Sequence, residues 1–191
     1  MKKLSVIIAL SLVAILTSCS NGKSIDSKSI DLKWTAYKTT GKVPVSGTFK
    51  EINISNIQQG NTIQESLNGV NFSIPVSSIF SNNESRDKKL QMYFFGVMEN
   101  TSILEGKLNV TSDTAGSLEV SMNGVTNSFP VEISAEGDLI SIAGVINLKD
   151  WNALSAVSSL NKACFELHKG ADGVSKTWDE VQVETTFSLS K

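Results

Sequence analysis

The stretch LEVSMNGVTNSFPVEISAEGDLISIAGVINL, residues 118–148, contains three apolar segments separated by two short turns. The first turn is Asn123-Gly124 and the second is Glu136-Gly137-Asp138. Both are turn sequences typical of β-hairpins, and the segments around them are rich in β-branched and aliphatic residues. The stretch therefore predicts three consecutive antiparallel strands.

Similar segments continue in both directions along the chain. Apolar residues alternate with a period of two, which indicates strands with one buried face. About eight or nine such strands joined by short turns predict a closed barrel or a sandwich. The other expected strands are residues 32–36, 43–49, 70–76, 104–110, 164–168 and 181–189, with a bulge near Lys50-Glu51.

Only two segments have the pattern of a helix, and the first of them is SRDKKLQMYFFG, residues 85–96. We expect Ser85 to cap this helix and its charged first turn to face solvent, with Tyr93, Phe94 and Phe95 directed inward. Arg86 and Asp87 are expected to form a local ion pair or a backbone cap. The second helix is expected at residues 150–162, capped by Asp150.

The N-terminal residues have the features of a secretory signal. Two lysines precede an apolar run at residues 4–16, which is shorter than the roughly 20 residues of a membrane-spanning helix. Leu16-Thr17-Ser18-Cys19 resembles the bacterial lipobox, in which the cysteine is lipidated. An ordinary signal with an incidental cysteine is the alternative. Ser20, rather than Asp, favours by the same resemblance the outer membrane over the inner one. We expect the lipoprotein to face the periplasm.

These features divide the chain into three parts. We expect a lipoprotein signal peptide at residues 1–18, a lipidated N-terminus with a flexible tether at 19–30, and a β-barrel domain at 31–191. Lipidation of Cys19 would anchor the protein in a membrane, and we expect this anchor to keep the mouth of the barrel near that membrane. Cys164 then has no partner for an intramolecular disulfide.

The charge of the chain argues against a nucleic-acid partner. Without the two lysines of the signal, the chain has 15 basic and 19 acidic residues, a net charge of −4. Proteins that bind nucleic acids usually present a basic patch, whereas the charges here are well mixed along the sequence.

The segment CFELH contains the residues most suggestive of chemistry. If it is a strand, Cys164, Glu166 and His168 lie on one face, and all three side chains can bind zinc or haem iron. Their parallel directions make a compact metal site unfavourable. We interpret them as the outer face of a strand, with Phe165 and Leu167 facing the core, and expect no metal. The sequence also contains no G-x-S-x-G elbow and no glycine-rich phosphate loop. We therefore expect a protein that is not an enzyme.

Four segments, in order, resemble motifs of the YceI-like family of bacterial polyisoprenoid-binding proteins. Gly47-Thr48-Phe49-Lys50 resembles an early "G-x-F" strand, and residues 78–95 resemble the central motif with its charged Arg86-Asp87-Lys88-Lys89-Leu90. Residues 122–126 resemble a hairpin "L-x-G-V-T", and residues 148–151 a late "L-x-D-F". The chain departs from the family at residues 95–100, which lack the proline of the usual strand entry.

The resemblance implies an all-β, eight-stranded antiparallel lipocalin-like barrel with one or two short helices. It implies that an isoprenoid chain or quinone tail lies inside, with no other cofactor, and it allows a homodimer. The alternative is an interaction lipoprotein whose barrel is filled by its own side chains and which acts through its outer surface or residues 168–180. The expected cavity-lining residues are Phe49, Phe72, Ile74, Phe94, Phe95, Ile142 and Trp151.

Overall fold

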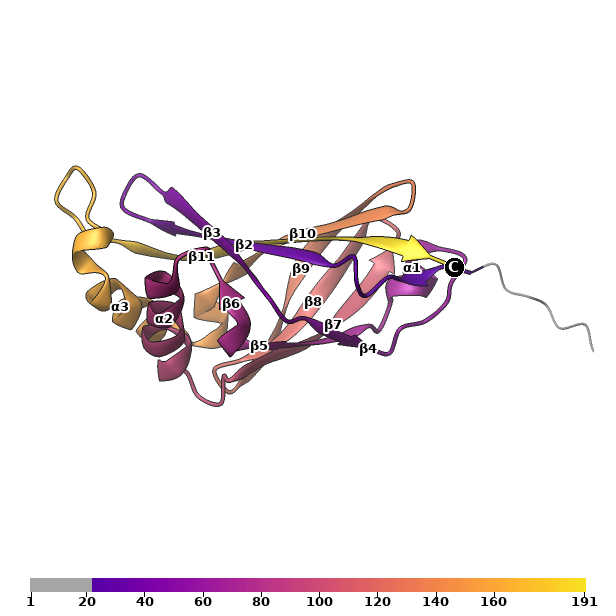
Figure 1. Ribbon diagram of the computed structural model, residues 1–191, viewed down its shortest axis with the longest axis horizontal. Coiled ribbons are helices and arrows are strands. Elements are labelled where there is room, and N and C mark those ends of the chain that lie inside the picture. Colours follow the sequence, from indigo (N-terminus) through magenta and orange to yellow (C-terminus); the bar gives the residue numbers. More distant parts are fainter. Residues whose placement is uncertain (1–21) are drawn as a thin grey trace, which may run out of the picture.

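A computed structural model describes residues 22–191, and the three strands expected in residues 118–148 are present in it (Figure 1). They are β8 (Ala115–Met122), β9 (Val125–Glu136) and β10 (Leu139–Asn147), and each pairs antiparallel with the next. The backbone φ angles of Asn123 and Gly124 are 53° and 68°, and that of Gly137 is 62°. Tight hairpin turns require such positive angles, which explains these turn residues.

One curled antiparallel sheet contains most of the chain (Figure 1). Its strands follow the order β4-β5-β7-β8-β9-β10-β11-β2-β3-β6, and β1 pairs with β11. Eight of the strands have five or more residues, as an eight-stranded barrel predicts, and three are very short. The remaining strands are β1 (Ser24–Ile25), β2 (Asp31–Lys38), β3 (Val43–Phe49), β4 (Asn53–Ser55), β5 (Asn71–Pro75), β6 (Ile79–Phe80), β7 (Ile103–Ser112) and β11 (Thr177–Ser190).

The two ends of the sheet meet in one stretch of chain. Strand β3 pairs with β2, and β4 pairs with β5 at the other end of the strand order. Only residues 50–52 separate β3 from β4, so the sheet curls until a single segment contacts both of its edges. The bulge expected near Lys50-Glu51 is this interruption between two strands.

Helices lie at both ends of the curled sheet (Figure 1). Helices α2 and α3 lie together at one end, and α1 lies at the other, beside β1 and the C-terminus. None of the helices in residues 22–191 is long and apolar enough to cross a membrane. The α-helices are α1 (Ile63–Leu67), α2 (Glu84–Tyr93) and α3 (Leu154–Ala163), and the 3-10 turns are η1 (Val76–Ser78), η2 (Phe95–Val97), η3 (Leu148–Trp151) and η4 (Phe165–Leu167).

Both expected helix caps were placed wrongly. The side chain of Asn83, not Ser85, accepts a hydrogen bond of 3.0 Å from the backbone N–H of Arg86 and caps α2. A helix was expected to begin at Asp150. This part of the chain instead forms η3, and α3 begins at Leu154 without a side-chain cap. Each helix begins directly after a residue in an extended or turn conformation. The sequence pattern alone did not locate that residue.

The strand expected at Cys164–His168 was also wrong. This segment leaves α3 and forms η4, so Cys164, Glu166 and His168 do not share a strand face. Phe165 and Leu167, which were expected to face the core, are 49% and 58% exposed. Glu166 instead forms an ion pair with Lys169, with 2.8 Å between the carboxylate oxygen and Nζ.

Asp87 acts as a backbone cap rather than as the partner of Arg86. Its buried carboxylate accepts hydrogen bonds from the backbone N–H of Ser81, at 2.9 Å, and from the Ser81 hydroxyl, at 2.5 Å. These bonds fix the turn that leads from β6 into α2. Asp87 is therefore the buried charge of the first turn of α2, whereas the neighbouring Lys88 is exposed.

Replacing Asp87 with alanine should destabilise the fold by about 2 kcal/mol, because two partly buried donors of Ser81 lose their carboxylate acceptor. The measurement is urea unfolding of the purified protein. Glu84→Gln is the matched control on the same helix, since the Glu84–Lys88 pair is exposed and should contribute little. Equal unfolding midpoints for Asp87→Ala and the unchanged protein would contradict this role of Asp87.

The fold begins before residue 31, which corrects the expected extent of the tether. Strand β1 pairs with the last residues of β11, Ile25 is buried, and Ile30 packs against the core. Residues 24–30 are therefore part of the domain and not a flexible linker. The expected signal peptide and Cys19 lie outside the described residues.

Two glycines in the sheet make room for aromatic side chains on the neighbouring strand. Gly47 of β3 lies opposite Trp34 of β2, and Gly106 of β7 lies opposite Phe72 of β5. A Cβ atom at Gly47 would collide with the Trp34 indole, and one at Gly106 would collide with the Phe72 ring. These close contacts place both rings over the inner face of the sheet.

A candidate ligand cavity

The interior of the sheet contains two adjoining apolar chambers. The first has a volume of about 130 Å³ and lies beside α2 and α3; we call it the helix-side chamber. The second has a volume of about 170 Å³ and lies toward β1; we call it the base-side chamber. Together they reach the lower end of the ~300–1,000 Å³ range of small-molecule pockets. Five residues line both chambers, so the two chambers adjoin: Trp34, Phe49, Leu104, Ile146 and Val183.

Both chambers are almost entirely apolar. Thr177 is the only polar residue that lines the helix-side chamber, and Thr185 is the only one that lines the base-side chamber. Inward-facing side chains such as Leu32, Val181 and Val183 remain only partly buried, because the space in front of them is open. Protein cores usually contain few voids larger than a water molecule, so this interior is not a filled core.

A larger and more polar pocket, which we call the mouth pocket, adjoins the helix-side chamber. Its volume is about 480 Å³, and it lies between α2, the end of α3 and the end of β2. Trp34 lines the mouth pocket and both chambers, so one side chain stands where all three spaces meet. The other lining residues are Ala36, Tyr37, Lys38, Val45, Asn83, Ser85, Arg86, Lys89, Leu90, Leu160, Cys164, Leu167, His168 and Thr177.

Six of the seven residues expected to line a cavity do so. Phe94 and Phe95 line the helix-side chamber, and Phe49 lines both chambers. Phe72, Ile74 and Ile142 line the base-side chamber. Whether these side chains contact a ligand stays a prediction.

Trp151 is the exception among the expected lining residues. Its side chain is 1% exposed, and its Nε1 donates a hydrogen bond of 2.9 Å to the backbone oxygen of Val120. Its ring packs edge-on against Phe129, with 6.2 Å between the centroids. Trp151 is therefore part of the packed core. Tyr93, expected to face inward, is 38% exposed and lines neither chamber.

The sequence did not identify Trp34 as a central residue of the cavity. The alternation at residues 32–36 placed it correctly on the inner face of a strand. Its position at the junction follows from Gly47 opposite it and from a hydrogen bond of 3.2 Å between its Nε1 and the backbone oxygen of Thr48. The only feature of the sequence that could have indicated this position of Trp34 was the glycine in the expected "G-x-F" strand.

Burial shifts the pKa values of the ionisable groups at the inner side of the mouth pocket. Burial, together with the nearby ammonium groups of Lys38 and Lys89, lowers the pKa of His168, so its imidazole is neutral at pH 7. Burial raises the pKa of the Cys164 thiol, which therefore stays protonated. Nδ1 of His168 lies 2.6 Å from the hydroxyl of Thr177. Among residues 22–191, no three His, Cys, Asp or Glu side chains gather as a metal site would require.

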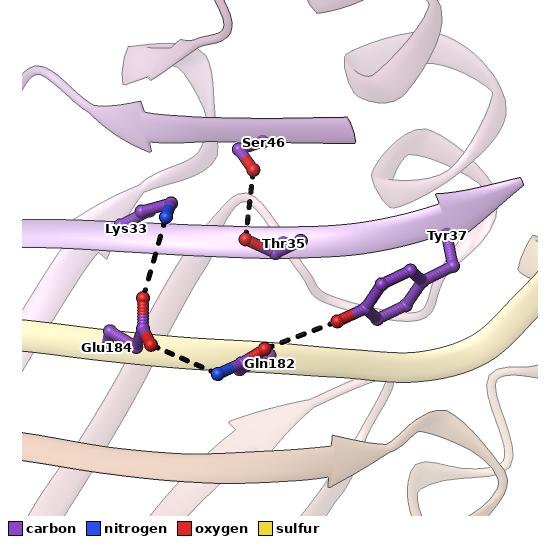
Figure 2. Close-up of polar contacts among 6 residues, drawn as sticks. All are labelled: Lys33, Thr35, Tyr37, Ser46, Gln182 and Glu184. Atoms are coloured by element: carbon purple, nitrogen blue, oxygen red, sulfur yellow. Dashed lines mark hydrogen bonds and ion pairs between the residues drawn. The ribbon is translucent and has the colours of Figure 1, made fainter. Parts of the chain in front are cut away.

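The opposite face of the same strands is polar. Figure 2 shows Thr35 hydrogen-bonded to Ser46, and Tyr37, Gln182, Glu184 and Lys33 linked in a chain of contacts of 3.0–3.6 Å. These residues alternate with Trp34, Ala36 and Val183, which face the cavity. The alternation fixes which side of each strand faces inward, because a slip of one residue would exchange the two sets.

Comparisons with known proteins agree with this architecture. The family model of the YceI-like domain matches residues 24–189. A polyisoprenoid-binding domain from Saccharophagus degradans, implicated in plant cell wall breakdown, superposes with a TM-score of 0.62 at 13% identity, covering 88% of this chain and 98% of that one. BcnA from Burkholderia cenocepacia gives a TM-score of 0.56 at 13% identity, with 88% and 100% covered. Identities this low demonstrate the shared fold alone.

A search of curated protein sequences found no match to the chain. The family match is nevertheless nearly as long as the described structure, and it includes all four segments whose motifs resemble the family. The two structural relatives share this fold, with TM-scores above 0.5 over 88% of the chain. The chain belongs to the YceI-like domain family.

Proposed function

We propose that this protein binds the apolar chain of a lipid, of the isoprenoid or quinone type, inside its barrel. The observation that carries the proposal is the pair of adjoining apolar chambers inside the sheet, with the mouth pocket next to them. The Saccharophagus degradans relative is described as a polyisoprenoid-binding domain, which supports the same class of ligand here. A filled barrel that acts only through its outer surface is the second candidate, and the open interior disfavours it.

The energetics favour a carrier or buffer over permanent storage. Each buried CH₂ group is stabilised by about 0.8 kcal/mol relative to water, so a long prenyl chain does not travel free in solution. A bilayer solvates the same chain about equally well. The net preference for the barrel is therefore small, and the protein can return its ligand to a membrane. Binding of this kind requires no catalytic group.

We propose in addition that Cys19 is lipidated and anchors the protein in the bacterial envelope, at the periplasmic side of the outer membrane. The lipobox-like Leu16-Thr17-Ser18-Cys19 and the Ser at position 20 support this location. Cys19→Ser should move the protein from the membrane fraction to the soluble periplasm and abolish labelling with radioactive palmitate. Unchanged labelling would exclude Cys19 as the acylated residue.

Native mass spectrometry with organic extraction tests the binding function directly. The sample is the chain from residue 20 to 191, secreted without lipidation, which contains the whole described fold. A prenyl lipid or quinone at about one molecule per chain is the expected result, because the two adjoining chambers together are about the size of one small-molecule pocket. A protein that stays free of lipid after incubation with such lipids would favour the filled-barrel alternative.

A further inference from the structure

Exposed apolar side chains gather at the end of the molecule that contains α2 and α3. Twelve large hydrophobic residues are exposed in residues 22–191, and eight of them belong to the β2–β3 hairpin, to α2 and α3, or to the short segments that follow these helices. Single exposed apolar residues are ordinary on a protein surface, whereas a concentration of them marks a surface that binds a partner.

Two neighbouring loops at this end carry four of these side chains, and we call the two loops the tip. They are residues 39–43, at the turn between β2 and β3, and residues 165–176, between α3 and β11, and both extend at the same end of the molecule (Figure 1). The Thr40 hydroxyl donates a hydrogen bond of 2.7 Å to the carboxylate of Asp172, so the two loops form one ordered unit. The exposed apolar residues of the tip are Val43, Phe165, Leu167 and Val174.

Lysines and a tryptophan adjoin these apolar side chains. Nζ of Lys42 lies 4.4 Å from the centroid of the Trp178 ring, and Nζ of Lys176 lies 3.4 Å from it. The Trp178 indole donates a hydrogen bond of 2.7 Å to the backbone oxygen of Thr39, which holds the ring between the two loops. Surfaces that lie in a membrane interface combine lysines with Trp, Phe and Leu, because lysine stems cover apolar surface while their ammonium groups stay in water.

Charge is distributed unevenly between this end and the rest of the chain. Residues 38–43, 84–93 and 162–180 contain eight basic and six acidic residues, a net charge of +2. The remainder of the chain from residue 19 contains seven basic and thirteen acidic residues, a net charge of −6. An anionic surface therefore attracts the end with the tip and repels the rest, so the molecule approaches such a surface with its tip first.

A bilayer fits the tip better than a protein partner does. The cores of protein–protein interfaces are depleted of lysine, whereas lysines lie among the apolar side chains here. The position of the tip gives a second argument. Lys38 and Leu167 line the mouth pocket, and Nζ of Lys38 donates a hydrogen bond of 3.0 Å to the backbone oxygen of Leu167. A membrane in contact with the tip would therefore lie next to the mouth pocket.

We infer that the tip docks on the surface of an anionic lipid bilayer. Phe165, Leu167 and Val174 enter the boundary between the head groups and the acyl chains, and Lys42 and Lys176 stay at the level of the lipid phosphates. The inference goes beyond the proposed function, because it concerns contact with a membrane surface and does not require a lipid inside the barrel.

Flotation with lipid vesicles tests the inference. The sample is the chain from residue 20 to 191, which lacks Cys19 and contains the whole described fold. The probes are vesicles of phosphatidylethanolamine and phosphatidylglycerol in equal parts, and vesicles of phosphatidylcholine alone. We expect at least about fivefold tighter binding to the anionic vesicles, because the lysines are attracted to them. Salt at about 1 M should remove most of this difference by screening the charges.

The variant Phe165→Ser/Val174→Ser should lower the affinity for the anionic vesicles at least about tenfold, because two apolar side chains no longer leave water. Both residues are exposed and line neither the chambers nor the mouth pocket, so the variant should fold normally. The matched control is Ile57→Ser/Leu139→Ser, which should bind as tightly as the original chain. Ile57 lies shortly before Gly60, which pairs with Lys23 next to β1, and Leu139 pairs with β11 near the C-terminus.

An added tryptophan gives a second measurement. The emission of Phe165→Trp should move to shorter wavelength when anionic vesicles are added, because the new indole leaves water, and that of Ile57→Trp should not. The absence of this shift, or equal losses of binding in both serine variants, would overturn the tip as the contact surface.

The remaining outcomes concern other occupants of the tip. No binding of the original chain to either kind of vesicle would overturn the inference. A dimer that Phe165→Ser/Val174→Ser dissociates, without vesicle binding, would instead identify the tip as an interface between two copies of the chain. These results are independent of the lipid content of the barrel, so they are distinguishable from a failure of the proposed function.

Discussion

Replacing Ala36 with tryptophan should empty the barrel of lipid without unfolding it. Ala36 lines the passage between the mouth pocket and the helix-side chamber, and its methyl group faces open space. An indole there fills the passage and blocks entry of a chain. Because the added ring occupies a void, it should cause little of the strain that overpacking causes in a filled core. We expect bound lipid to fall from about one to under about a tenth per chain, since the route to the cavity is closed.

The matched control for this variant is Ala143→Trp. Ala143 lies on β10 between the inward-facing Ile142 and Gly144, so its side chain is on the outer face of the sheet. The same chemical change on the outside should leave lipid content unchanged, and both variants should melt within about 4 °C of the original protein. If Ala36→Trp retained its lipid while folded, the ligand would have to lie elsewhere. If it unfolded, the passage would be packed and the filled-barrel alternative would gain support.

Replacing Gly47 with alanine should destabilise the protein by about 3 kcal/mol, a large effect for one methyl group. The added Cβ would collide with the indole of Trp34 and would lie 2.7 Å from the backbone oxygen of Phe80. Both neighbours are held in place, Trp34 by its hydrogen bond to Thr48 and Phe80 by its pairing with β3. The measurement is the midpoint of urea unfolding, compared with the original protein.

Gly41→Ala provides the control, because the nearest atom to a Cβ at Gly41 is the Thr39 hydroxyl at 3.7 Å. This substitution should be close to neutral, since it adds no overlap and reduces the freedom of the unfolded chain. The double variant Gly47→Ala/Trp34→Phe should recover part of the lost stability, because the smaller ring relieves one of the two overlaps. Equal stability of the Gly47→Ala and Gly41→Ala variants would show that Trp34 is not held against β3.

The sequence predicted most of the sheet because strands that are buried on one face repeat every two residues. The same rule failed at residues 164–168, where Phe165 and Leu167 alternate with polar residues but are exposed in a 3-10 turn after α3. Helix α1 has five residues, too few to produce a helical period, and it was missed. In these short segments the neighbours in space determine the conformation, and local periodicity carries little information.

The cavity was predicted in part for a related reason. Alternation identified which side chains face inward, and six of the seven expected residues line the chambers. Alternation does not distinguish an inward side chain that borders open space from one that packs against its neighbours. For this reason Trp151 was among the residues expected to line the cavity. The mouth pocket was not predicted at all, because it brings together Lys38, Arg86 and His168 from three separate parts of the chain.

The position of β1 changes how an anchored molecule would face its surroundings. We expected the anchor to hold the mouth near the membrane, but β1 lies beside the C-terminus, at the end of the sheet opposite α2 and α3 (Figure 1). The 14 residues of β11 that run between these ends span about 45 Å. The five Cα–Cα steps from Cys19 to Ser24 add at most about 18 Å. If Cys19 held the protein with its long axis perpendicular to the membrane, the mouth pocket would therefore face away from that membrane. The protein would then exchange its lipid with an opposing membrane or a soluble acceptor.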